Sequence, residues 1–224
     1  EFYMYNYTYI NIVGVLWMHM TPLKNASTVI SKLHALGNRV FYITNNSTKT
    51  LEEFMDKCKI LEFEASKDNI LCTANLSAKY LHKLGFSKKA YVIGSEGKIY
   101  YKLINFVYIY LVRCIESCAE RKALIMGKPE PYIANILKER YNVNPARTLM
   151  IGDRCNTDIL LGTRYGFKTL LVLTGVTNLQ QVEQWKQSNK PEEKELVPDY
   201  YIDSLGDLLY YIELFTSKSK KKLI

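Results

Sequence analysis

Short β-rich runs alternate with helical patterns along most of this 224-residue chain, and this alternation constrains the fold more than any other feature. Repeated units of one strand and one helix are typical of a parallel sheet with helices on both faces. Their crossovers are right-handed, so the strands gather into one doubly wound sheet. We therefore predict an α/β fold.

Apolar spacing and end signals locate the expected elements. The β-rich runs predict strands over residues 9–14, 39–43, 90–94, 148–151, 168–173 and 200–202. Helical spacing predicts helices over residues 25–36, 51–58, 74–84, 132–137 and 157–165, through Val182 and Trp185, and over 205–215. Thr50 and Glu53 have the spacing of a capping box. Between residues 96 and 122 the alternation becomes irregular.

The positive charge of the chain does not indicate a nucleic-acid partner. The formal net charge is +8, but four of the basic residues stand in the terminal SKSKKKLI. The remaining charge of about +4 is too dilute for a basic stripe. We expect no nucleic-acid partner and interpret the tail as a solvated chain end.

The five cysteines favour a reducing compartment. Their number is odd, no C-x-x-C occurs, and no histidine stands at ligand spacing, so neither a disulfide framework nor a zinc site is indicated. We expect a cytoplasmic protein.

No segment has the length that a membrane span needs. The most apolar stretch, residues 103–112, has only ten residues, whereas a bilayer requires about 20. The amino end lacks the basic region of a signal peptide. Because the chain begins at Glu1, we expect a fragment or an incomplete gene model.

Polar side chains gather where strands of the predicted sheet end. Thr44 and Asn45 follow one strand, and Asp153 follows another. Lys128 stands in the stiff turn Gly-Lys-Pro-Glu-Pro, and Asp158 stands at a helix start. Ligands of such sheets bind at the carboxyl ends of the strands. A hydroxyl, an ammonium group and two carboxylates could bind a phosphoryl group and a divalent cation. Taken singly, these residues are more typical of a turn, a helix entry and a cap, and only their joint occurrence points to a site.

Four segments extend this pattern to a known family: GVLW (14–17), VFYITNNSTKT (40–50), GKPEPYI (127–133) and MIGDRCNTDILLGTRYGFKTLLVLTGVT (150–177). Together they closely resemble the haloacid dehalogenase-like (HAD) phosphatases, in the branch of 4-nitrophenylphosphatase and phosphoglycolate phosphatase. The similarity covers residues 14–97 and 124–209.

The resemblance implies a Mg²⁺-dependent phosphomonoester hydrolase that acts on a small phosphorylated metabolite and has a Rossmann-like core with a mobile cap. It implies that Thr44 and Asn45 bind phosphate and that Lys128 steadies both the phosphate and the nucleophile. It also implies that Asp153 and Asp158 belong to the metal site. In this family an aspartate at the end of the first strand attacks phosphorus, and a second aspartate two residues later serves as acid and base.

The chain departs from the family at this first motif. The expected Asp-x-Asp-Gly aligns with Asn11-Ile12-Val13-Gly14, and no carboxylate occurs between Glu1 and Glu52. Asn11 cannot attack as a carboxylate, and Val13 cannot transfer a proton. Metal binding should weaken too, because a neutral amide replaces an anionic ligand. Of the catalytic residues that the family motifs supply, Lys128 is then the one that this chain retains.

A second departure concerns the insertion between Thr44 and Lys128, which stand only 84 positions apart. The family's larger cap needs a longer insertion. We predict a HAD-like core over residues 1–50 and 123–224 and a truncated α/β cap over residues 51–122.

Two functions therefore remain open. One is a phosphatase of this branch that is inactive or strongly impaired, and the other is a catalytically silent protein that binds phosphate or a partner. Nucleic-acid binding through the lysine tail is the weakest hypothesis. A homodimer is a further possibility that the sequence does not decide.

Overall fold

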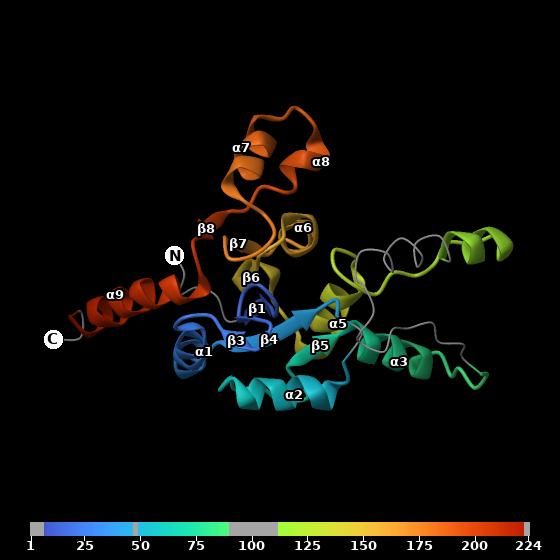
Figure 1. The fold of residues 1–224 in the computed structure, drawn as a ribbon, viewed down its shortest axis with the longest axis horizontal. Helices are drawn as coiled ribbons and strands as arrows, with labels where there is room; N and C mark the ends of the chain where they lie inside the picture. Colours follow the sequence, from blue (N-terminus) through green and yellow to red (C-terminus); the bar gives the residue numbers. More distant parts are fainter. Residues whose placement is uncertain (1–6, 47–48, 90–111, 222–224) are drawn as a thin grey trace.

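The computed structural model of the chain describes residues 7–46, 49–89 and 112–221, which build a six-stranded parallel sheet (Figure 1). From edge to edge its strands are β5 (Ile70–Cys72), β4 (Arg39–Thr44), β1 (Tyr7–Asn11), β6 (Thr148–Gly152), β7 (Lys168–Val172) and β8 (Tyr200–Ile202). From β1 the chain builds one half of the sheet through β4 and β5 and the other half through β6, β7 and β8. The predicted doubly wound α/β fold is confirmed, and β1 lies at the point where the strand order reverses.

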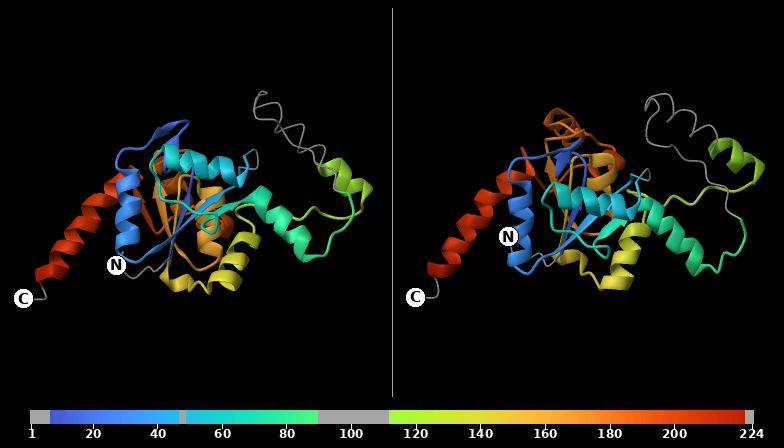
Figure 2. Two further views of the ribbon diagram at one scale, coloured as in Figure 1. Left: turned by 90° about the horizontal axis from the view of Figure 1, so that it is seen from below. Right: turned by 60° about the horizontal axis from the view of Figure 1, so that its bottom comes forward.

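Helices cover both faces of this sheet (Figures 1 and 2). One face packs against α1 (Ala26–Ala35), α2 (Leu51–Ile60) and the start of α9 (Leu208–Lys221). The other face packs against α3 (Thr73–Lys83), α5 (Tyr132–Tyr141) and α6 (Leu160–Arg164). Two further helices, α7 (Leu179–Gln187) and α8 (Pro191–Lys194), lie beyond α6 at the β7–β8 end. The sheet is therefore the middle of three layers.

The central strand β1 is buried on both faces because its side chains alternate between the two layers. Ile10 packs in the cluster that contains Val29 and Ile30 of α1. Tyr9 faces the opposite layer, where its ring lies 5.3 Å from the ring of Phe41. Both β1 side chains are fully inaccessible to solvent. The near-continuous apolar run of this strand is thus the pattern of a strand covered on both sides.

Most expected elements occur within a few residues of their predicted bounds, and the capping box of α2 is confirmed. Thr50 Oγ1 accepts a hydrogen bond from the Glu53 amide at 3.2 Å, and the Thr50 amide donates to the Glu53 carboxylate at 2.6 Å. The first strand ends at Asn11 rather than near residue 14, since the chain turns at Gly14, where φ is +83°. Glycine adopts this left-handed conformation without steric cost.

Three short strands were not predicted. They are β5 and the hairpin strands β2 (Trp17–Met18) and β3 (Thr21–Pro22). The hairpin strands have two residues each, too few to display a periodicity, and β5 runs directly into α3 with no turn residue to mark its end. The predicted strand over 90–94 lies outside the described residues, as does all of the apolar run at 103–112 except its last residue, and residues 112–118 are helical.

Helix α2 and strand β5, which follow the predicted core–cap boundary at residue 51, pack with the sheet. Phe54 and Cys58 of α2 lie in the same apolar cluster as sheet residues, and β5 pairs with β4. The apolar face of α2 is therefore buried against the sheet. The division of the chain into core and cap stays a prediction. Within the described ranges, no helix combines the length and apolar character that a bilayer crossing requires.

Candidate active site

The predicted site residues meet at one edge of the sheet. Asn11 ends β1, Thr44 ends β4, and Asp153 directly follows β6. Because neighbouring parallel strands point the same way, their carboxyl ends open onto the same crevice. Lys128 reaches this edge from the turn before α5, and Asp158 from a turn of π-helix over Cys155–Ile159. Such π-turns are frequent at functional sites.

Asn11 lies at the centre of this cluster and links three other groups. Its amide nitrogen Nδ2 donates to Asp153 Oδ1 at 2.7 Å and to the backbone oxygen of Val13 at 3.2 Å. Its amide oxygen Oδ1 accepts a hydrogen bond from Lys128 Nζ at 2.9 Å. The opposite amide orientation would aim Oδ1 at two oxygens and Nδ2 at an ammonium group, so the neighbours select this one.

Lys128 forms a buried ion pair. Its Nζ lies 2.7 Å from Asp158 Oδ1, and the two side chains are 2% and 0% exposed. The contact is ionic rather than a well-aligned hydrogen bond. Nζ also donates to the backbone oxygen of Ile43 at 3.3 Å. The ammonium group therefore contacts a carboxylate, an amide oxygen and a carbonyl oxygen at the end of β4.

Asn45 positions Lys128 through the backbone. Asn45 Nδ2 donates to the Lys128 carbonyl oxygen at 2.9 Å, and the Lys128 amide donates to Asn45 Oδ1 at 2.8 Å. A Cβ atom on Gly127 would lie 2.8 Å from Asn45 Oδ1, which explains why the residue before Lys128 has no side chain. Both ends of the Asn45 amide are thus engaged by Lys128, whereas the phosphate role predicted for Asn45 stays a prediction.

Thr44 presents a hydroxyl at the same strand end. Its side chain is nearly buried, and Oγ1 accepts a hydrogen bond from the backbone amide of Asn46 at 3.1 Å. That contact uses a lone pair of the hydroxyl and leaves its hydrogen for another acceptor. The predicted phosphate role of Thr44 is compatible with this position.

Asp153 accepts hydrogen bonds at both carboxylate oxygens. Oδ1 receives the Asn11 amide, and Oδ2 receives the backbone N–H of Val176 at 3.2 Å. Burial raises the pKa of Asp153 above its usual value, and the nearby charge of Asp158 adds to this shift, which the Asn11 and Val176 hydrogen bonds only partly oppose. A Cβ atom on Gly175 would lie 1.9 Å from Asp153 Oδ2, so the segment after β7 closes tightly on this carboxylate.

Sequence reasoning missed the part of the site that follows β7. Thr177 is buried, its Oγ1 accepts a hydrogen bond from the Cys155 amide at 3.0 Å, and its own amide donates to the Asp153 carbonyl oxygen at 3.0 Å. It lies at the same edge of the sheet as Thr44, so the rule that located Thr44 applies equally to it. Val13 contributes only its backbone oxygen to the cluster, and the residue is 45% exposed.

Comparisons with known proteins agree with this geometry. Residues 8–101 match a family model described as haloacid dehalogenase-like hydrolase, and residues 125–208 match one described as HAD-hydrolase-like. Glycerol-3-phosphate phosphatase of Gallus gallus is 30% identical over 279 aligned positions, which cover 89% of each chain. This chain belongs to the haloacid dehalogenase-like hydrolases. The Homo sapiens glycerol-3-phosphate phosphatase is likewise 30% identical, over 88% of this chain and 87% of its own.

Solved structures of HAD phosphatases share the fold. The p-nitrophenyl phosphatase of Archaeoglobus fulgidus superposes with a TM-score of 0.75 at 20% identity, over 92% of this chain and 99% of its own. The 4-nitrophenylphosphatase of Thermotoga maritima gives a TM-score of 0.72 at 19% identity, over 92% and 97%. The 279 positions aligned with the Gallus gallus protein exceed the 224 residues of this chain by 55, so at least that many face gaps here.

HAD phosphatases generally use Mg²⁺, but the donor groups of this chain do not fit that ion as they are arranged. Mg²⁺ binds oxygen ligands and keeps several waters. Asp153 is 5% exposed, Asp158 is buried against Lys128, and Asn11 turns N–H groups toward the remaining oxygens. Among the described residues, no three His, Cys, Asp or Glu side chains gather as a metal-binding group. The assignment of Asp153 and Asp158 to a metal stays a prediction.

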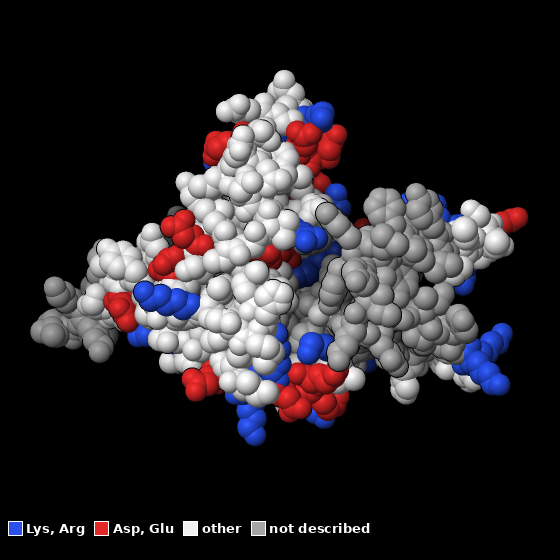
Figure 3. All heavy atoms as spheres, in the orientation of Figure 1, with Lys and Arg blue, Asp and Glu red and all other residues white. Residues whose placement is uncertain are grey.

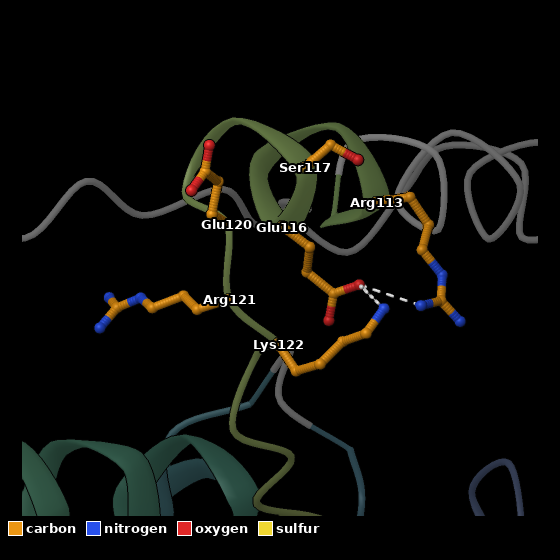
Figure 4. Close-up of a pocket in the computed structure, with 6 residues that line it drawn as sticks. All are labelled: Arg113, Glu116, Ser117, Glu120, Arg121 and Lys122. Atoms are coloured by element: carbon orange, nitrogen blue, oxygen red, sulfur yellow. Dashed lines mark hydrogen bonds and ion pairs between the residues drawn. The ribbon is translucent and has the colours of Figure 1, made fainter.

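A hollow lies on the helical segment of residues 112–118 and the turn after it, which Figure 1 places away from the sheet edge. Its volume is about 270 Å³, and Figure 4 shows the Glu116 carboxylate at its centre. That carboxylate accepts hydrogen bonds from the Ala123 amide at 2.8 Å and from Arg113 at 3.0 Å, and it pairs with Lys122 at 3.5 Å. The Glu116 carboxylate is therefore already engaged by neighbouring residues, which indicates a structural role.

Charges of both signs are mixed over the described part of the face in Figure 3, where Lys and Arg lie among Asp and Glu. A nucleic-acid ligand needs a broad positive surface. The expectation of no nucleic-acid partner stays a prediction.

Proposed function

We propose that this chain binds small phosphomonoesters at the crevice between β1 and β4 and that its hydrolytic turnover is lost or strongly reduced. The substrate class is supported by the relatives, whose names state glycerol 3-phosphate as a substrate. Thr44 and Lys128 supply a hydroxyl and an ammonium group at one strand end, the two kinds of group that bind phosphate oxygens.

The observation that carries the loss of turnover is the position of Asn11. Its side chain lies between Lys128 Nζ and Asp153 Oδ1, at 2.9 and 2.7 Å, where the attacking carboxylate of the family is expected. An amide is a poor nucleophile, and the covalent route requires a nucleophile. Val13 offers no group that could protonate a leaving alcohol. Placement and charge stabilisation by Lys128 are then the only catalytic contributions left to these motifs.

The test is an assay of the purified chain with 4-nitrophenyl phosphate and Mg²⁺. We expect no turnover above that of a Thr44→Val variant, which removes the phosphate-facing hydroxyl with little change in volume. The double variant Asn11→Asp, Val13→Asp restores both missing groups and should raise the rate by about 10²-fold or more. Thr44→Val in the double-variant background serves as its matched control and should lower the gained rate.

Circular dichroism and gel filtration of every variant verify that each is folded. Clear Mg²⁺-dependent turnover by the unaltered chain would refute the proposal. A folded double variant without turnover would show that Asn11 and Val13 are not the only obstacles to hydrolysis, because a lid that excludes water is needed as well.

A silent binding protein is the second candidate function, favoured by the internal pairing of the cluster. Lys128, Asp153 and Asp158 all find partners within the site. Equilibrium dialysis with ³²P-labelled phosphate separates the two. Binding by the unaltered chain together with an inactive double variant favours the silent protein, whereas a restored double variant favours the impaired enzyme.

A further inference from the structure

Two oxygens in the site point at one place, and the amide nitrogen of Asn11 occupies that place. Asp153 Oδ1 lies 2.7 Å from Nδ2, and the Val13 carbonyl oxygen lies 3.2 Å from it. A carboxylate oxygen and a backbone carbonyl oxygen that converge on one point are ligands of a hard cation. A primary amide has two N–H hydrogens, which is the number needed to satisfy both oxygens.

The charges of the cluster also indicate that the Asn11 amide stands where a cation would bind. Lys128 carries one positive charge, and Asp153 and Asp158 can carry two negative charges. Asn11 adds none, and one of its N–H groups donates to the negative charge that remains at Asp153. A carboxylate at position 11 would raise the total to three acids against one ammonium, and such a site needs a cation for balance.

We propose that the Asn11 amide has replaced the divalent cation in this chain, so that the site is assembled without a metal and excludes one. The inference concerns the assembly of the site and does not depend on whether phosphate is bound or hydrolysed. The proposal concerns the folded protein at equilibrium, so a direct measurement of cation binding can test it.

The experiment titrates the chain with Mn²⁺ as an electron-paramagnetic probe and records its thermal unfolding in MgCl₂ and in EDTA. We expect the unaltered chain to show no bound Mn²⁺ at millimolar concentrations and the same unfolding temperature in both solutions. Asn11→Asp should bind Mn²⁺ at least about tenfold more tightly than the unaltered chain, because ligand charge sets cation affinity. Its unfolding temperature should rise in MgCl₂.

Two controls locate the effect. Asn178→Asp makes the same chemical change at the N-cap of α7, where aspartate caps equally well, and should leave Mn²⁺ binding unchanged. Asp153→Asn added to Asn11→Asp should remove the binding that Asn11→Asp creates. If that binding survived, the cation would lie elsewhere and the proposal would be wrong.

Equal Mn²⁺ affinity in the unaltered chain and in a folded Asn11→Asp variant would overturn the inference, as would tight binding by the unaltered chain. Should Asn11→Asp fail to fold, Asn11→Ala gives the same test, since it frees both oxygens without adding charge. It should bind Mn²⁺ more tightly than the unaltered chain, and equal affinity would contradict the replacement. Turnover with 4-nitrophenyl phosphate tests the proposed function separately, so either proposal can fail alone.

Discussion

At the residue scale, the ion pair between Lys128 and Asp158 makes the site part of the stability of the fold. Both side chains are almost completely buried. A buried charge without its partner is costly, because the protein interior replaces little of the hydration that the charge has lost. The pair therefore constrains substitution at this edge of the sheet whether or not the site is catalytic.

Lys128→Met should lower the free energy of unfolding by about 3–5 kcal/mol, because it leaves the buried Asp158 carboxylate without its ion-pair partner. The double variant Lys128→Met, Asp158→Leu should regain most of that loss. Urea unfolding measures both changes. Lys186→Met is a matched control, since it breaks the exposed pair with Glu183 and should change the free energy of unfolding far less. Similar losses for the two lysines would contradict the importance of burial.

At the scale of elements, the edge strand β8 is joined to β7 by a side-chain network as well as by backbone pairing. Asp199 Oδ1 accepts a hydrogen bond from Lys168 Nζ at 2.6 Å, and Oδ2 accepts from the amide and the hydroxyl of Thr169, both at 2.9 Å. Burial alone would raise the pKa of Asp199, but the hydrogen bonds from Lys168 and Thr169 outweigh it and lower the pKa.

This shift predicts a pH dependence of stability. Because the pKa of Asp199 is lower in the folded chain, its stabilisation is present above the unfolded pKa of about 3.9 and is lost as pH falls through the folded pKa. Asp199→Asn should cost about 1 kcal/mol at pH 7 and progressively less below pH 4. Urea unfolding of both proteins at pH 7 and pH 3 measures the difference. A difference that grew toward pH 3 would contradict the sign.

At the scale of the whole molecule, β1 couples the two helical layers and the site. Its side chains reach both apolar clusters, and its last residue is Asn11. Loss of packing at its centre should therefore be felt on both faces of the sheet, whereas the same loss at an edge should stay local.

Ile10→Ala should lower the free energy of unfolding by about 2–5 kcal/mol, the range for buried aliphatic truncations. Ile202→Ala makes the same change in the half-buried edge strand β8 and should cost less than half as much. Chemical denaturation compares the two variants. Equal costs would show that β1 holds no special place in the packing.

Local pattern was sufficient for much of this structure. The alternation of strands and helices, the capping box of α2 and the arrival of Thr44, Asp153 and Lys128 at one sheet edge all follow from signals within a few residues. These features can be predicted from the sequence because capping hydrogen bonds and apolar spacing are properties of single helices and strands. The strand β5 escaped prediction, since it runs directly into α3 at Thr73 and no turn residue marks its end.

The hydrogen-bonding roles of the Asn11 and Asn45 side chains, by contrast, depend on the tertiary structure. Asn11 donates an N–H to Asp153 and accepts a hydrogen bond from Lys128, which stand 142 and 117 positions away. The packing of β1 beside β6 brings Asp153 into contact, and the turn before α5 brings Lys128. Asn45 likewise holds the Lys128 backbone across 83 positions. An amide can donate or accept, and its surroundings select between the two, so the residue type alone leaves its chemistry undecided.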